Sequence, residues 1–194
     1  MAHHDPCPVW AGYLLASPLR KLMVSPRALL RPYVAEGMTI LEPGPAMGFF
    51  TLELARLAGP TGRVVAVDVQ QQMLDRLRRR AKRVGLAARI DARLADHDRM
   101  HIEDLNGTAD FALVFACVHE MPSADAFFRE AFTALRKGAR MLFAEPTQVE
   151  DAEFQDEVSK ARQAGFRVET PLAIRGSRAV LLAKSCGSAR SRVT

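Results

Sequence analysis

The sequence predicts an α/β protein built on a doubly wound sheet, and three observations lead to that prediction. From residue 38 onward, short apolar runs alternate with segments whose apolar residues recur every three or four positions. This pattern is typical of strands and helices linked by right-handed crossovers. Residues 166–174 and 178–184 have strand character and flank a short turn, which indicates a terminal antiparallel hairpin. The length of 194 residues suits one domain with a buried sheet.

The individual elements follow from local composition. Residues 63–69, RVVAVDV, are apolar and β-branched, as in a strand buried on both faces. Residues 73–84 carry their apolar side chains on one helix face and are followed by Gly85, a typical helix-ending residue. The expected strands cover residues 38–43, 63–69, 89–94, 110–118, 140–144, 166–174 and 178–184, and the expected helices cover residues 49–57, 73–84, 124–135 and 149–164.

The first 37 residues stand apart from this alternation. Prolines interrupt them repeatedly, and the apolar residues between the prolines recur at helical spacing. We therefore expect residues 1–37 to form a helical extension or lid, residues 38–185 to form the main domain, and residues 186–194 to be a flexible tail.

Composition excludes several classes of protein. Hydrophobic residues make up 48% and charged residues 25% of the chain, as in ordinary globular proteins. The longest uncharged apolar run, residues 111–118, is far shorter than a membrane-spanning helix. The N-terminus lacks the pattern of a signal peptide. Three widely spaced cysteines, Cys7, Cys117 and Cys186, indicate neither a disulfide framework nor a zinc site. These features predict a cytoplasmic protein with no membrane partner.

The main chemical signal is ILEPGPAMGFF, residues 40–50. An apolar strand leads into Glu42, and Gly44, Ala46 and Gly48 follow at alternate positions. Small residues let a backbone approach a ligand closely, and the next helix presents its positive N-terminal end there. In open α/β sheets such loops lie at the carboxyl ends of the strands, where ligands bind.

A second signal follows one strand later. Asp68 ends the run RVVAVD, and a carboxylate at this place can accept hydrogen bonds from both hydroxyls of a ribose. The glycine loop and this acid together favour an adenosine cofactor, either a nicotinamide dinucleotide or S-adenosylmethionine (SAM).

Several segments resemble the motifs of class I SAM-dependent methyltransferases. ILEPGPAMG resembles their first motif, with Ala46 in place of its middle glycine, and VVAVDVQQQML resembles their second-strand motif. ARLAD is similar to their third strand, DFALVFACVHEMP to the fourth strand of the small-molecule methyltransferase group, and LRKGARMLFAEP to their fifth strand with its preceding turn. The resemblance covers residues 38–184.

The resemblance implies a Rossmann-like, seven-stranded sheet of order 3-2-1-4-5-7-6 with the last strand antiparallel, and S-adenosylmethionine as cofactor. It also implies a contact for each matching residue. Glu42, Gly44 and Gly48 would hold the methionine end of SAM, with Ala46 in the same loop; Asp68 would hold the ribose; Val69, Asp96 and His97 would frame the adenine; and Ala116 would line the sulfonium side.

His119 and Glu120 are the candidate catalytic residues, because they follow the fourth strand beside the expected methyl group. His119 is a candidate general base for an acceptor hydroxyl or amine, and Glu120 is a second candidate. Alternatively, one of the two caps the following turn or shapes the pocket. Methyl transfer is an in-line displacement that depends mainly on positioning in a water-poor pocket, so a base is not obligatory.

Other polar residues have structural interpretations that stay open. The glycines are also consistent with a simple strand-to-helix turn, Asp68 with a helix N-cap, and Asp96 with a turn residue. His97 and His101 are four residues apart, but no third ligand is evident, so we predict no metal site.

The extension and the basic helix bear on the acceptor. Trp10 and Tyr13 are candidate substrate-binding residues if the extension is a lid, although a buried helix face explains them equally well. The run RLRRRAKR, residues 76–83, carries six basic side chains and contributes to a net charge of +5. Its expected place is a solvated outer face, with phosphate contact as the alternative.

The compact chain has no large insertion after the fifth expected strand, which favours either a small acceptor or an open site. Three other functions compete with methyl transfer to a small molecule. A nicotinamide-dependent oxidoreductase needs a small residue where Phe49 stands in G-x-G-x-x-G. An RNA methyltransferase agrees with the basic charge, but no RNA-binding module is visible. A SAM-binding protein without catalytic activity is the third. The methyl acceptor and the oligomeric state are not predicted.

Overall fold

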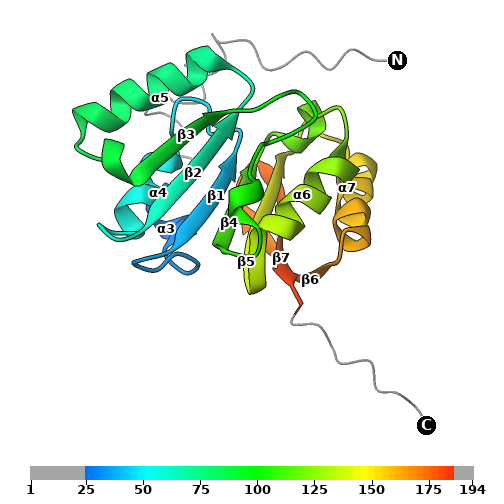
Figure 1. Cartoon of the computed structure of the whole chain (residues 1–194). Helices are drawn as coiled ribbons and strands as arrows, with labels where there is room; N and C mark the ends of the chain where they lie inside the picture. The colour runs from blue at the N-terminus through cyan, green and yellow to red at the C-terminus, as the bar shows by residue number, and fades with distance from the viewer. Residues whose placement is uncertain (1–24, 186–194) are drawn as a thin grey trace.

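The computed structural model describes residues 25–185, which form a seven-stranded sheet of order β3-β2-β1-β4-β5-β7-β6 (Figure 1). The first five strands pair in parallel, and β7 is antiparallel to both β5 and β6. This arrangement confirms the predicted fold class and strand order. The strands are β1 (Thr39–Pro43), β2 (Arg63–Asp68), β3 (Ile90–Leu94), β4 (Ala109–Phe115), β5 (Leu135–Pro146), β6 (Phe166–Ile174) and β7 (Ser177–Lys184).

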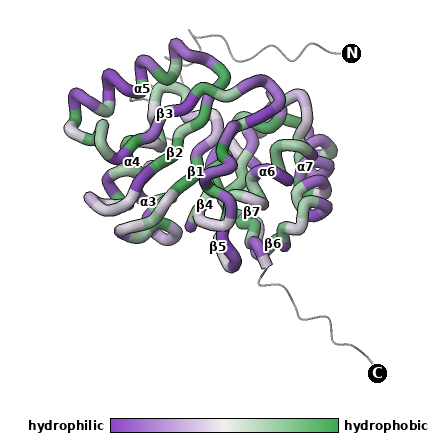
Figure 2. The backbone as a smooth tube through the Cα atoms, viewed as in Figure 1, coloured by the Kyte–Doolittle hydropathy of each residue, from purple (hydrophilic) through white to green (hydrophobic). Residues whose placement is uncertain are grey.

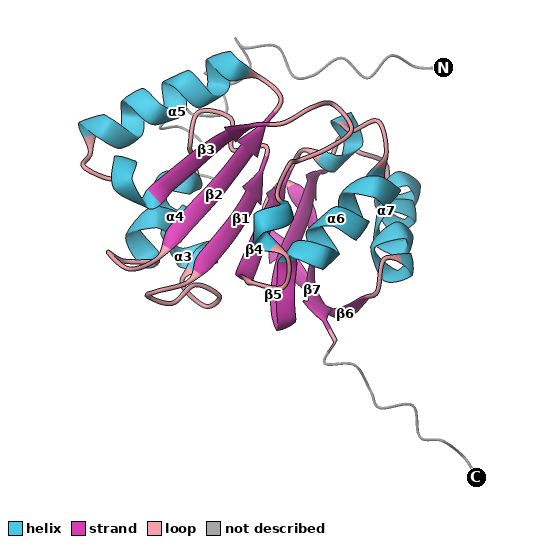
Figure 3. Ribbon diagram, viewed as in Figure 1, coloured by secondary structure: helices cyan, strands magenta, loops and turns pink. Residues whose placement is uncertain are grey.

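Helices cover both faces of the sheet, as Figure 3 shows. The α-helices are α3 (Pro26–Leu30), α4 (Thr51–Leu57), α5 (Gln71–Arg83), α6 (Ala124–Ala134) and α7 (Asp151–Gln163), and the 3₁₀ helices are η1 (Ala87–Arg89), η2 (Glu103–Leu105) and η3 (Val118–Glu120). Successive side chains of β4 point to opposite faces of the sheet. Phe111 and Leu113 pack with residues of α3 and α4, whereas Ala112 and Val114 pack with residues of α6 and α7.

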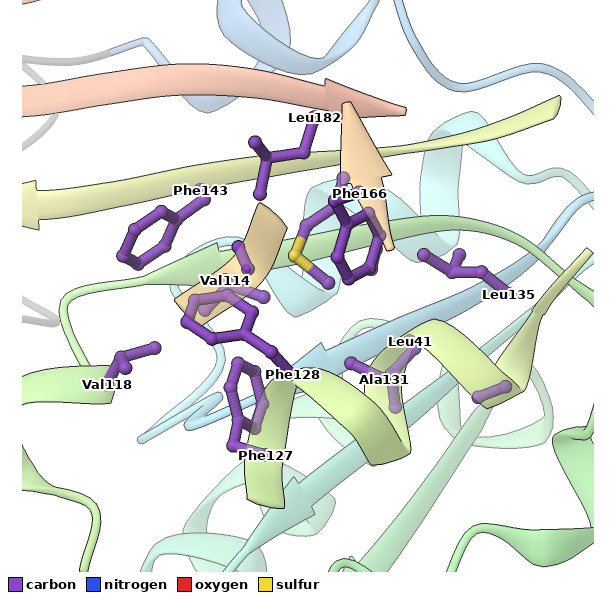
Figure 4. Close-up of a cluster of buried hydrophobic side chains, with 14 of the residues drawn as sticks. Leu41, Val114, Val118, Phe127, Phe128, Ala131, Leu135, Phe143, Phe166 and Leu182 are labelled. Atoms are coloured by element: carbon purple, nitrogen blue, oxygen red, sulfur yellow. The ribbon is translucent and has the colours of Figure 1, made fainter. Parts of the chain in front are cut away.

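Aromatic side chains build the core beneath α6 and α7 (Figure 4). Phe128 of α6 is fully buried, and its ring meets that of Phe143 on β5 edge to face, with centroids 5.4 Å apart. Phe166 at the start of β6 closes the same cluster. Such ring pairs add to the free energy gained from apolar burial, and they fix these helices against the sheet.

Helix α5 is amphipathic in the predicted way. Met73, Leu74, Leu77 and Ala81 are buried against the sheet, while most of the basic side chains of this helix are exposed. Figure 2 shows the hydrophobic colour concentrated in the central strands and hydrophilic colour recurring along α5 and α7. The helix therefore packs on the sheet through one apolar face and has no second one.

The described end of the expected extension, residues 25–37, joins the core. The Ser25 side chain accepts a hydrogen bond from the Ala28 N–H, and Pro26 occupies the first turn of α3, where a missing N–H costs nothing. Leu30 is fully buried with residues of α4 and β1. Pro26 thus begins a helix rather than ending one.

Two predicted boundaries were wrong. The fourth strand was expected to reach Val118 but ends at Phe115, because Ala116 has a left-handed φ of 58° and η3 follows. The fifth strand was expected over residues 140–144 but begins at Leu135, directly after α6, with a register shift opposite Ala109.

Within residues 25–185, no helix is both long enough and apolar enough to cross a membrane.

Candidate active site

A hollow lies at the carboxyl ends of β1, β2, β3 and β4. The loops that follow these four strands all contribute to its lining, and the N-terminal part of α6 completes it. Because the carboxyl ends of parallel strands meet at one edge, loops far apart in sequence come together here. The predicted ligand-binding edge of the sheet is therefore a concave surface.

The glycine loop after β1 approaches its neighbours too closely for side chains. Gly44 has a φ of 64°, its N–H donates to the Val67 carbonyl at 2.9 Å, and a Cβ added there would lie 2.8 Å from Cys117 Cβ. Gly48 has a φ of 81°, and a Cβ there would lie 2.5 Å from Leu77 Cδ1 of α5. The loop needs glycine at both positions for conformation and for space.

Ala46 also has a left-handed conformation, with a φ of 47°. A residue with a Cβ pays about 1–2 kcal/mol there. Strained backbone of this kind concentrates at functional sites, where the surrounding structure enforces it. The alanine that replaces the middle glycine of the motif thus keeps a glycine-like backbone, and it lines the hollow.

Arg80 of α5 holds the same loop from behind. Its guanidinium donates a short hydrogen bond to the Met47 carbonyl. Burial lowers the pKa of this guanidinium, and the neighbouring charge of Arg83 lowers it further. Sequence analysis placed the whole basic run on an outer face, so Arg80 is an exception that only the tertiary structure reveals.

Glu42 at the end of β1 is a buried acid facing the hollow. Only 3% of the residue is exposed, and its Oε2 atom has no hydrogen-bond partner among the described residues. Burial raises its pKa to about 8; the Thr51 hydroxyl lowers it, and the charge of Asp68 raises it. A buried oxygen without a donor suits a ligand that brings a donor of its own, such as an ammonium group.

Asp68 at the end of β2 lines the same hollow as Glu42. Burial raises its pKa to about 6; hydrogen bonds from the backbone N–H groups of Gln70 and Ala46 lower it, and the charge of Glu120 raises it. The Gln70 N–H donates to Oδ1 at 2.9 Å. The Asp68 carboxyl group therefore lines the hollow, and the residue lies two positions before Gln70, the N-cap of α5.

The loop after β3 forms the adjacent wall. Val69, Asp96 and His97 all line the hollow, and 37% of Val69 is exposed. Asp96 Oδ2 lies 2.6 Å from His101 Nε2, and the Asp96 N–H donates to the Arg99 carbonyl at 3.0 Å. Asp96 is therefore both a turn residue and a lining residue. Within the described chain, no three side chains are grouped as metal ligands.

The end of β4 places the two candidate catalytic residues differently. Glu120 and Ala116 line the hollow, but His119 does not. His119 Nδ1 lies 2.6 Å from Glu145 Oε2, and its Nε2 lies 3.7 Å from Glu120 Oε1. The hydrogen bond to Glu145 raises the pKa of His119, and burial opposes that effect. The histidine is thus one side chain removed from the hollow.

Most predicted cofactor contacts come together in this hollow. It is lined by Glu42, Gly44, Ala46, Asp68, Val69, Asp96, His97 and Ala116, together with Glu120. Gly48 of the same loop does not line this hollow; it lines a second hollow between α3, α4 and α5. Trp10 and Tyr13 fall outside the described residues.

An aromatic wall was missed by sequence analysis. Phe49 and Phe50 meet with ring centroids 4.9 Å apart, and Phe50 meets Phe115 at 4.7 Å. All three residues line the hollow. The adjacent phenylalanines after the glycine motif were the available signal, but their spacing alone suggested only the start of a helix.

The hollow is strongly acidic. Six carboxyl groups line it against a single arginine, Arg99: those of Glu42, Asp68, Asp96, Asp98, Glu120 and Glu130. SAM fits this charge, because its sulfonium and ammonium groups are cationic. The unpartnered Oε2 of Glu42 and the close backbone at Gly44 suit the methionine end of that cofactor.

Comparison with known proteins agrees with this geometry. The methyltransferase-domain family matches residues 35–175. The Escherichia coli O1:K1 ubiquinone/menaquinone biosynthesis C-methyltransferase UbiE is 26% identical over 112 residues, which make up 58% of this chain and 44% of that protein. The chain thus matches less than half the length of this relative.

Solved structures share the fold. A SAM-dependent methyltransferase from Aquifex aeolicus superposes with a TM-score of 0.81 at 21% identity, covering 91% of this chain and 98% of that one. A protein described as a putative rRNA-methylase from Clostridium thermocellum has a TM-score of 0.66 at 17% identity, covering 84% and 94%. With the family match over most of the chain, the protein belongs to the methyltransferase-domain family, as a class I member whose cofactor is S-adenosylmethionine.

Proposed function

We propose that the protein transfers the methyl group of SAM by in-line displacement to a small acceptor that is neutral or cationic. The observation that carries this proposal is the pair of buried acids, Glu42 and Asp68, which end adjacent parallel strands and line the same hollow as the glycine loop. When bound, SAM supplies an electrophilic methyl group on sulfur. The protein then needs to orient the acceptor and exclude water.

Each lining residue has a role in this proposal. Glu42 binds the ammonium group of the cofactor, with the backbone at Gly44 and Ala46 alongside, and Asp68 accepts hydrogen bonds from the ribose hydroxyls. Val69, Asp96 and His97 frame the adenine, and Ala116 leaves room beside the sulfonium. The aromatic wall of Phe49, Phe50 and Phe115 excludes water from the reacting atoms.

The charge of the hollow favours a small acceptor over RNA. Its acidic lining repels phosphates, whereas nucleic-acid sites are usually basic. The UbiE relative supports the same choice at 26% identity. RNA is the second candidate, because α5 carries several exposed basic residues and one structural neighbour is described as a putative rRNA-methylase. Trp10 and Tyr13 remain candidates for contacts to either acceptor.

Calorimetric titration with SAM and with NADH tests the cofactor assignment. We expect micromolar binding of SAM, no binding of NADH, and a loss of at least about tenfold in SAM affinity for D68N, because the ribose loses a charged acceptor. D75N is the matched control, since Asp75 lies on the outside of α5. Binding of NADH without SAM would contradict the proposal.

Formation of S-adenosylhomocysteine tests the transfer itself. A panel of amines, phenols and quinols is compared with total RNA as acceptor. Turnover with a small compound supports the proposal, turnover with RNA alone favours the second candidate, and SAM binding without turnover on any acceptor favours a non-catalytic SAM-binding protein.

A further inference from the structure

Glu145 at the end of β5 is a buried acid with both carboxylate oxygens occupied. It is fully buried; its Oε1 accepts a hydrogen bond from the Val118 N–H at 2.7 Å, and its Oε2 lies 2.6 Å from His119 Nδ1. A carboxylate in such a place is costly unless its partners satisfy it. Both of its partners belong to η3, the short helix that also carries Glu120.

The imidazole of His119 lies between two carboxylates. Its Nδ1 faces Glu145, and its Nε2 faces Glu120 Oε1 at 3.7 Å. A carboxylate that accepts from Nδ1 fixes the tautomer and the ring orientation. The opposite nitrogen then faces an acid, which favours a proton on that nitrogen as well. Glu120 is the member of this series that lines the hollow.

We propose that Glu145 is a positioning residue that acts through His119 to hold the Glu120 carboxylate toward the acceptor, and that the acceptor carries an N–H or O–H group for Glu120. This inference rests on the proposed methyl transfer. The acceptor atom forms a bond to the methyl carbon with its lone pair, the carbon–sulfur bond breaks with its electrons going to sulfur, and the acceptor proton moves to Glu120. Amines and phenols meet this requirement.

The titratable groups around His119 come from three elements. Glu145 lies on β5, Glu120 on the same turn as the histidine, and Glu157 on α7. Glu157 is 4% exposed and its Oε2 has no partner among the described residues. Burial is the main cause that raises the pKa of Glu157 to about 8, and the charges of Glu145 and Glu153 also raise it. It is therefore largely protonated at neutral pH, which makes E157Q a matched control with little change in charge.

Nitrogen NMR of the histidine side chains in the full chain tests the positioning directly. In the wild type we expect the His119 resonances, identified by their loss in H119Q, to show a protonated Nδ1 and to titrate above the ordinary range of a histidine side chain. E145Q should lower the pH of that titration, and E157Q should leave it near the wild-type position. An ordinary titration in the wild type, or one that E145Q does not move, overturns the proposal even if a variant folds poorly.

Kinetics with an acceptor found in the screen test the functional part. E120Q should lower kcat by about 100-fold or more, and E145Q by about 10- to 100-fold, with the KM for SAM unchanged within about twofold. E157Q should keep the wild-type kcat. If the wild type does not bind SAM, the proposed function is contradicted. If SAM binds normally and kcat is unchanged in both E145Q and E120Q, only this inference is contradicted.

Discussion

At the scale of single residues, burial decides how the site responds to pH. Asp68 has a pKa raised to about 6, first by burial. Its ionised form is the one that accepts hydrogen bonds from a ribose. Protonation of Asp68 should therefore lower the affinity for SAM as the pH drops through about 6. Calorimetry between pH 5 and pH 8 measures this dependence, and a wild-type affinity that is constant over the range contradicts it.

Glu42 responds at higher pH than Asp68. Burial raises its pKa to about 8, so the acid is largely protonated at pH 7 without ligand. An ammonium group beside it favours the carboxylate, and SAM binding at pH 7 should then release a proton. Titrations in buffers with different ionisation enthalpies measure that release. E42Q should abolish it, and a wild-type binding enthalpy that is the same in every buffer would falsify this linkage.

Most of the cofactor contacts proposed from the sequence line the hollow, because each follows a strand in a motif of fixed spacing, although many other lining residues carried no such signal. The sequence could not identify Glu145 or Arg80. Glu145 is 26 residues from His119, and its burial depends on how β5 packs against α7. Arg80 is one of six basic residues in a run, and only the position of the loop shows which one reaches a carbonyl. Contacts between distant segments have no local signature.

At the scale of elements, the strand-to-helix loop after β1 sets the shape of the site. G44A should destabilise the protein by several kcal/mol, because its Cβ would lie 2.8 Å from Cys117 Cβ at a φ of 64°. G85A is the matched control: its φ is 71°, but no atom lies within 4 Å, so we expect a cost of about 1 kcal/mol. Urea unfolding compares the two variants, and equal losses would contradict the steric argument.

Element type was predictable where the local pattern was strong, as in the helical periodicity of α5 and the β-branched apolar run of β2. Boundaries failed where tertiary pairing extended or ended an element. β5 lengthened because Leu135 pairs with Ala109, and β4 shortened because Ala116 turns into the left-handed region to line the hollow. The shortened strand departs from the local pattern at the candidate site, where such departures are expected.

At the scale of the whole molecule, basic and acidic residues gather in different places. The net charge is +5, and much of the excess lies in the basic run on α5, whereas the hollow is lined by six acids and one arginine. The molecule thus presents a negative site on a positive body. Net charge alone suggested an anionic partner, but the local charge at the site favours a cation.

This division predicts how salt affects cofactor and product. SAM and S-adenosylhomocysteine differ by the methyl group and the sulfonium charge, so their other contacts cancel in a comparison. Salt screens exposed charges over about 10 Å at 0.1 M and about 3 Å at 1 M. The Kd for SAM should therefore rise more steeply with salt than the Kd for S-adenosylhomocysteine, as calorimetry at a series of salt concentrations would measure. Equal slopes would mean that the acidic lining does not act on the sulfonium. A steeper slope for SAM would mean that this lining favours the charged cofactor over the neutral product, which assists product release.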